Sequence, residues 1–157
     1  MCSPKWLFLV PGGLLILLGC LGAALAIPSV KIGPATFEAH TLLFASLCIL
    51  LGYQSVVFAL MTKSFAMNEG FLPNDPKLVG FFRFATLERG LITGAVMALA
   101  GCAILLGAVV SWQQKGFGLL DYGSTMKWVI PGATMAALGF QTVLFSFLVS
   151  MTGISRK

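Results

Sequence analysis

The chain has 157 residues, of which 58% are hydrophobic and only 10% are charged. A soluble domain usually carries about a quarter charged residues, so this composition indicates a membrane protein. The net charge of +5 points to phospholipid headgroups or a lipid phosphate. Nucleic acid is not the expected partner, because the sequence has no basic stripe with interleaved aromatic residues.

Four apolar blocks predict four transmembrane helices, at about 6–27, 39–63, 88–112 and 128–152. Each block holds about 20 or more residues, which is enough for a helix to cross a hydrocarbon core about 30 Å thick. No alternation typical of a membrane β-barrel is found, so helices are the expected way to span the bilayer. The predicted fold class is therefore all-α, a polytopic membrane protein with one transmembrane domain over residues 1–157.

The first block also has some features of a signal peptide. Lys5 precedes it, and Ala24-Leu25-Ala26 resembles a cleavage site. Its apolar run of about 21 residues, however, is longer than the apolar core of about 7–15 residues that a signal peptide carries. We therefore expect this block to remain as the first membrane helix.

The basic residues predict the orientation of the helices. The first tail, the long 62–90 connection and the last tail carry seven of them, whereas the other two connections carry three. Because basic residues concentrate on the cytoplasmic side, both termini are predicted to be cytoplasmic, in a bacterial or archaeal membrane. The seven are Lys5, Lys63, Lys77, Arg83, Arg89, Arg156 and Lys157, and the three are Lys31, Lys115 and Lys127.

The 62–90 connection is the only long polar one, yet it keeps several phenylalanines. Asp75 followed by Pro76 is typical of a helix start, since the carboxylate can cap the helix and proline needs no N–H partner there. We expect an interfacial segment at about 64–87, with a short helix over about 76–87 in or near the cytoplasmic headgroup layer. An ordinary amphipathic connector is the open alternative. The phenylalanines are Phe65, Phe71, Phe81, Phe82 and Phe84.

An internal repeat places the same amide twice in apolar sequence. "LGYQSVVF" contains Gln54, and "LGFQTVLF" contains Gln141 in the same frame. If the four helices form two hairpins, these hairpins are parallel repeats, related by an axis along the membrane normal. Gly52 and Gly139 belong to stripes of small residues, about 200° around the helix from each glutamine. Each amide is therefore expected to face protein, a polar lipid group or a partner subunit, either joining helices or binding a ligand.

The motifs of common catalytic sites are absent. The sequence has no Gly-rich phosphate loop, no GxSxG, no HExxH and no Asp-x-Asp, and its single histidine excludes a Cys/His metal cluster. We therefore assign no catalytic residue, no metal ligand and no cofactor to this chain. Arg89, near the start of the third block, either binds a lipid phosphate or anchors the helix at the interface.

Several segments nevertheless resemble a known family. "SPKWLFLVPG", "GFLPNDPKL", "LERGLITG" and "VIPGATMAALGFQTVLFSFLVS" are similar to the C-terminal membrane region of family 2 glycosyltransferases, such as dolichol-phosphate sugar synthases. These enzymes transfer a sugar from a nucleotide donor to a polyprenyl phosphate. Their catalytic GT-A domain, with its Asp-x-Asp site, precedes the membrane region. The resemblance therefore implies a non-catalytic membrane domain or subunit, which anchors the lipid phosphate and presents it to a cytoplasmic catalytic domain.

Within this reading, four residues are candidates for binding the lipid phosphate: Lys63, Lys77, Arg83 and Arg89. The expected partners are membrane lipids, polyprenyl phosphate among them, a catalytic glycosyltransferase domain or subunit, and further copies of the chain. Two alternatives stay open, a small carrier or flippase of lipid-linked sugars and a membrane scaffold without a ligand. A carrier is less favoured, because two glutamines and a few hydroxyls make a thin polar path across a membrane.

Overall fold

The computed structural model describes residues 8–28, 31–32, 35–36, 39–68, 87–116 and 122–151. In these segments the chain forms four helices: α1 (Val10–Ala26), α2 (Ala39–Asn68), α4 (Leu87–Gln114) and α5 (Tyr122–Met151). The all-α prediction is confirmed. One small addition was not predicted: β1 (Lys31–Ile32) and β2 (Ala35–Thr36) pair antiparallel between α1 and α2, with Lys31 opposite Thr36.

The helix boundaries differ from the prediction mainly where the ends are polar. α4 begins and ends within two residues of the predicted 88–112, whereas α2 continues five residues beyond 63 and α5 begins six residues before 128. Apolar blocks mark only the part of a helix that suits hydrocarbon, while backbone hydrogen bonds carry the helix on into polar sequence. α1 begins at Val10, with Pro11 in its first turn, where proline is tolerated.

Part of the predicted interfacial segment can be placed. Residues 64–68 belong to the last turns of α2 and are not a separate element. The predicted short helix at about 76–87 falls mostly on residues 69–86, which lie outside the described residues. It therefore stays a prediction.

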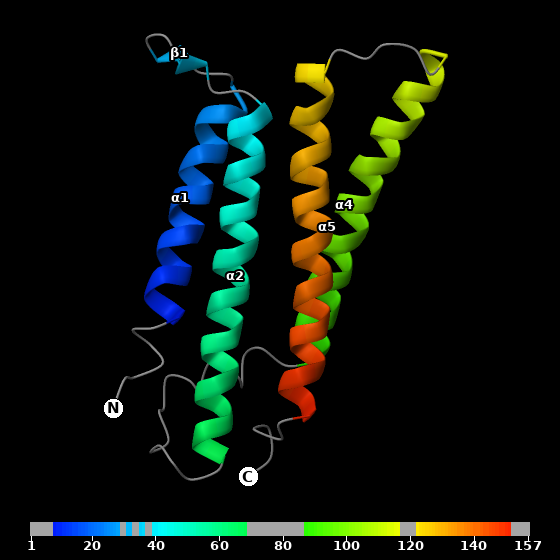
Figure 1. Ribbon diagram of the computed structural model, residues 1–157. Helices are drawn as coiled ribbons and strands as arrows, with labels where there is room; N and C mark the ends of the chain where they lie inside the picture. The colour runs from blue at the N-terminus through cyan, green and yellow to red at the C-terminus, as the bar shows by residue number, and fades with distance from the viewer. Residues whose placement is uncertain are drawn as a thin grey trace.

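The four helices stand side by side in the order α1, α2, α5, α4 (Figure 1). α1 and α4 run in one direction, and α2 and α5 run in the other. The lower end, as we call it here, holds the start of α1, the end of α2, the start of α4 and the end of α5. The upper end holds β1 and β2. Among the described residues, three segments are long and apolar enough to cross a membrane, namely Ala39–Met67, Glu88–Gln114 and Gly123–Met151, while α1 is a shorter apolar helix.

Glycines bring α1 and α2 into backbone contact. A Cβ added at Gly12 would lie 2.9 Å from the carbonyl oxygen of Gly52, and a Cβ at Gly52 would lie 2.6 Å from that of Gly12. Seven residues, or two helical turns, further along α1, Gly19 lies in the same way against Ala45 and Ile49. There is no room for a side chain at these points. The small residues therefore permit the close approach of α1 and α2 that the stripe predicted.

The contact between α4 and α5 repeats this arrangement. Gly94 lies against Gly139 and Val143, as Gly12 lies against Gly52 and Val56. Gly94 follows Gly12 by 82 residues, whereas Gly139 follows Gly52 by 87. The same two offsets relate the upper contact of α1 and α2 to that of Gly101 with Gly132 and Ala136. The internal repeat therefore includes the first helix of each pair, where the sequence comparison had not found it.

Two small apolar clusters join α5 to the first helix pair. The upper one contains Ala26, Ala39, Leu42 and Ile130, and the lower one contains Met67, Phe145 and Val149. Many other large apolar side chains are exposed, including Leu99 at 70%. Such a surface is expected of a bundle whose outer faces meet lipid, because the bilayer is as apolar as these side chains.

Candidate functional site

The two repeated glutamines meet at one place in the structure. Gln54 on α2 and Gln141 on α5 both line a cavity of about 150 Å³ between these helices. Gln54 is exposed and Gln141 is half-buried. The remaining wall is mostly apolar and comes from Tyr53, Val57, Leu144, Phe145 and Leu148. The repeat therefore places its two amides at one shared interface, not at two separate ones.

Polar contacts around this cavity are unevenly satisfied. The hydroxyls of Tyr53 and Thr142 lie 2.7 Å apart and link α2 to α5. The Oε1 atom of Gln141, in contrast, is buried and has no hydrogen-bond partner among the described residues. A buried amide oxygen without a donor costs free energy, more so in hydrocarbon. The link across the interface is thus made by the tyrosine, and the role of the amides stays a prediction.

Of the four candidate phosphate-binding residues, Lys63 and Arg89 lie within the described residues, and Lys77 and Arg83 lie outside them. Lys63 is only 9% exposed although it is charged. It follows Val56 by seven residues, or two helical turns, and so shares the face of α2 that packs on α1. A lysine in a polar connection is expected at the surface, so the sequence did not predict that Lys63 is buried.

Ser64, next to Lys63, was missed by the sequence analysis altogether. It is fully buried, and its hydroxyl oxygen has no hydrogen-bond partner among the described residues. It follows Val57 by seven residues and therefore shares the face of α2 that packs on α5. The only sequence signal was a short polar run, Thr62-Lys63-Ser64, between apolar residues near the end of the helix.

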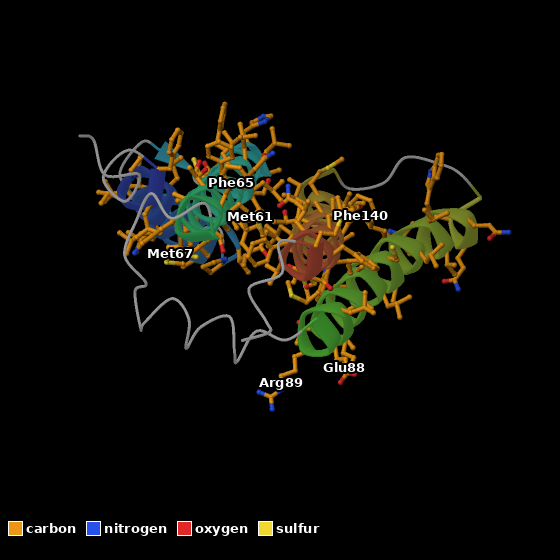
Figure 2. All side chains as sticks on the ribbon, turned by 90° about the horizontal axis from the view of Figure 1, so that it is seen from below. Met61, Phe65, Met67, Glu88, Arg89 and Phe140 are labelled. Atoms are coloured by element: carbon orange, nitrogen blue, oxygen red, sulfur yellow. The ribbon has the colours of Figure 1, made fainter. Side chains whose placement is uncertain are left out.

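Arg89 takes a different position from Lys63. It lies in the first turn of α4 and is exposed, as is its neighbour Glu88. Both side chains project away from the bundle (Figure 2). Lys63 and Arg89 therefore share the lower end, but α2 and α4 each pack against α5, which stands between them in the row (Figure 1).

Comparison with known proteins assigns this chain to a family. Residues 60–153 match the model of the glycosyltransferase family 2 C-terminal transmembrane region. The chain belongs to this family. This transmembrane region is also 32% identical, over 152 residues, to the low-salt glycan biosynthesis hexosyltransferase Agl6 of Haloferax volcanii. That match covers 96% of the present chain but only 36% of Agl6. No solved structure matches the chain.

The family assignment confirms the resemblance that the sequence indicated. Together with the three long apolar helices, it identifies the chain as a membrane protein. The matched residues begin at Leu60, in the last turns of α2, and continue through α4 and α5. They therefore include the whole lower end of the bundle except α1, with both Lys63 and Arg89.

Proposed function

We propose that the chain is the non-catalytic membrane domain or subunit of a polyprenyl-phosphate glycosyltransferase system. In this role it anchors the lipid acceptor and presents its phosphate to a cytoplasmic catalytic domain. The observation that carries the proposal is the family match over residues 60–153, supported by the similarity to a hexosyltransferase. None of the common catalytic motifs that we searched for occurs in the 157 residues, so we assign the sugar transfer to another domain or chain.

Under this proposal all four helices cross the membrane. α1 has 17 residues and a rise of about 26 Å at 1.5 Å per residue, which is short for a span. Its glycines, however, hold it against α2 over several turns, and the π-type turn at residues 8 and 9 extends it. Both chain termini and the 69–86 connection then lie on the cytoplasmic side, in agreement with the distribution of basic residues.

The phosphate is proposed to bind at the lower end of the bundle. Lys63 supplies a cation that is only 9% exposed, and Arg89 supplies one that projects away from the bundle. Guanidinium suits phosphate because it donates two parallel hydrogen bonds. Lys77 and Arg83 belong to the same proposal through their place in the 69–86 connection. The isoprenoid tail would then follow the apolar outer faces of the helices.

Binding of undecaprenyl phosphate to the purified protein tests this proposal, with undecaprenol as the matched ligand that lacks the phosphate. We expect the phosphate form to bind more tightly, and the double variant Arg83→Ala/Arg89→Ala to lose most of this difference. Lys63→Met should weaken the phosphate form as well. Lys127→Met, at the upper end, is the control and should bind as the unchanged protein does. If the double variant binds both ligands unchanged, the phosphate does not bind at these residues.

The catalytic partner can be tested separately. Reading the coding sequence on both sides of this chain will reveal whether a GT-A domain with an Asp-x-Asp motif is encoded next to it. Such a domain, in the same or a neighbouring reading frame, is expected. If none is present and no glycosyltransferase co-purifies with the protein, a scaffold role becomes the better explanation.

A further inference from the structure

The contact between α4 and α5 is close in its lower half and opens toward the upper end. Gly94 and Gly101 on α4 touch the backbone of α5, and Gly132 on α5 still meets the side chain of Ile104. One turn beyond, a Cβ added at Gly107 would meet nothing within 4 Å. Figure 1 shows α4 leaning away from α5 over this stretch. The two helices thus lie further apart at the upper end than at Gly94 and Gly101.

Pro131 in α5 lies beside the last of these backbone contacts, at Gly132. Proline has no N–H, so the Lys127 carbonyl loses its usual helical donor, and the ring disfavours a straight helix. The backbone contacts with α4 lie at Gly132 and below, while the separated turns lie before Pro131 in sequence. Pro131 therefore lies beside the last backbone contact, where the two helices begin to separate.

The other helix pair shows that such an opening is not required by the fold. At the upper end of α1 and α2, Ala26 is fully buried against Ala39, Leu42 and Ile130. The two helix pairs can be compared directly, since the glycine contacts of α1 with α2 match those of α4 with α5 position by position. At the upper end of the α4–α5 pair, in contrast, the described residues leave a cavity.

A cavity of about 400 Å³ occupies the opening. Its polar wall consists of Ser111 and Lys115 on α4 and Ser124 and Thr125 on α5, with Trp128 beside them. Deeper in the bundle the wall becomes apolar, through Ile104 and Ala108. Among the described residues that line the cavity there is a cation but no acidic side chain. Its chemistry therefore favours an anionic group that has an apolar continuation.

The positions of these side chains match the depth of a lipid headgroup. Lys115 follows the last turn of α4 directly, and Thr125 lies in the first turn of α5. Trp128 is 69% exposed, as is typical of indoles that anchor in the interface between headgroups and acyl chains. The Ser111 hydroxyl donates to the Ala108 carbonyl at 2.8 Å, so it is available to an anion only after rotating. Lys115 and the Thr125 hydroxyl are the main donors.

We propose that this cavity binds the phosphodiester headgroup of an anionic bilayer phospholipid, such as phosphatidylglycerol, at the membrane face opposite to the lower end. The Lys115 ammonium meets the phosphate charge, the Thr125 hydroxyl donates to one of its oxygens, and Trp128 packs against the glycerol region. A first acyl chain lies along Ile104 and Ala108. The site is distinct from the proposed acceptor site at Lys63 and Arg89, and it does not depend on the proposed function.

The test is a titration of the full chain, in detergent micelles, with dioctanoyl phosphatidylglycerol and with dioctanoyl phosphatidylcholine, followed by native mass spectrometry. We expect preferential retention of phosphatidylglycerol. Lys115→Gln should lower its affinity about fivefold, the effect of one lysine near an anionic surface. Gly107→Leu should lower it further by filling the cavity, and it should fold, because a Cβ at this position meets no other atom.

Two matched controls separate the site from general effects. Lys127→Gln removes a lysine near the start of α5, also at the upper end, that does not line the cavity. Gly13→Leu adds a leucine at another helical glycine with open space around it. Both should bind phosphatidylglycerol as the unchanged protein does. The proposal is overturned if Lys115→Gln and Gly107→Leu retain full affinity, or if Lys127→Gln lowers it equally. It is also overturned if undecaprenyl phosphate displaces phosphatidylglycerol from the cavity at lower concentration, since the site then takes a polyprenyl phosphate.

Discussion

The Tyr53 hydroxyl on α2 donates a hydrogen bond to the Thr142 hydroxyl on α5, across 2.7 Å. The direction follows from proton number, because the single proton of Thr142 already goes to the Leu138 carbonyl at 2.7 Å. In the repeat, Tyr53 corresponds to Phe140 and Thr142 corresponds to Ser55. Phenylalanine has no hydroxyl, so this cross-helix link exists on one side of the α2–α5 interface only.

Replacement of Tyr53 by phenylalanine tests the strength of this link. Tyr53→Phe keeps the ring and removes only the donor, while Thr142 keeps its own bond to Leu138. We expect the free energy of unfolding to fall by about 0.5–1.5 kcal/mol, the usual range for a hydrogen bond between membrane helices. Reversible unfolding in mixed micelles, followed by circular dichroism, measures it.

A double-mutant cycle with Thr142→Val separates the hydrogen bond from changes in packing. The coupling energy between the two positions should be of the same order, about 0.5–1.5 kcal/mol. Fully additive single effects would mean that the two hydroxyls do not stabilise the interface in the membrane-like environment, whatever their distance.

Two adjacent glycines in α1 give a second test, of the backbone contact between α1 and α2. A Cβ at Gly12 would lie 3.0 Å or less from three atoms of α2, whereas a Cβ at Gly13 would meet nothing within 4 Å. Gly12→Ala should therefore push the helices apart and lower the free energy of unfolding by about 1–3 kcal/mol. Gly13→Ala should leave it unchanged or raise it by up to about 1 kcal/mol, because alanine favours the helix. Equal effects at both positions would contradict the close contact.

The comparison of α4 with α5 explains what hydropathy can and cannot predict. α4 is apolar almost to its ends, and its bounds, Leu87–Gln114, lie within two residues of the expected 88–112. α5 starts with the polar stretch "YGSTMK", which reads as a loop by composition although it forms the first turns of the helix. Composition records the solvent that each turn meets, not whether the backbone is helical. The β1–β2 hairpin was missed because strands of two residues are too short to show a period.

The site was predictable only in part, for a similar reason. The spacing of Gly52 and Gln54 predicts a close-packing face opposite an amide, because it depends on one helix alone, and Gly52 does pack against α1. The meeting of Gln54 and Gln141 in one cavity depends on how α2 and α5 cross, which no single helix determines. The opening between the upper ends of α4 and α5 likewise depends on the angle between these two helices. Sequence patterns thus identified the residues of each face, while their partners required the structure.

Gln141 offers a test of whether the repeated amides hold the helices together. Its Oε1 atom is buried without a hydrogen-bond partner among the described residues, so Gln141→Met removes a desolvated acceptor and keeps the shape. We expect the free energy of unfolding to stay within about 0.5 kcal/mol or to rise. Gln54→Met, at the exposed amide of the same cavity, is the control and should change it as little. A loss above about 1.5 kcal/mol in Gln141→Met alone would show that this amide staples the bundle.

The proposed orientation can be measured with two exposed positions at opposite ends of the bundle. Glu88 projects from the start of α4, and Lys115 follows its end. In a variant whose four cysteines are replaced by alanine, Lys115→Cys should react with a membrane-impermeant maleimide in intact cells. Glu88→Cys should react only after the membrane is permeabilised, because the positive-inside rule places the lower end in the cytoplasm. Both cysteines should react equally in detergent, which controls for access. The reverse pattern in intact cells would place the phosphate-binding candidates Lys63 and Arg89 on the outer face, away from any cytoplasmic catalytic domain.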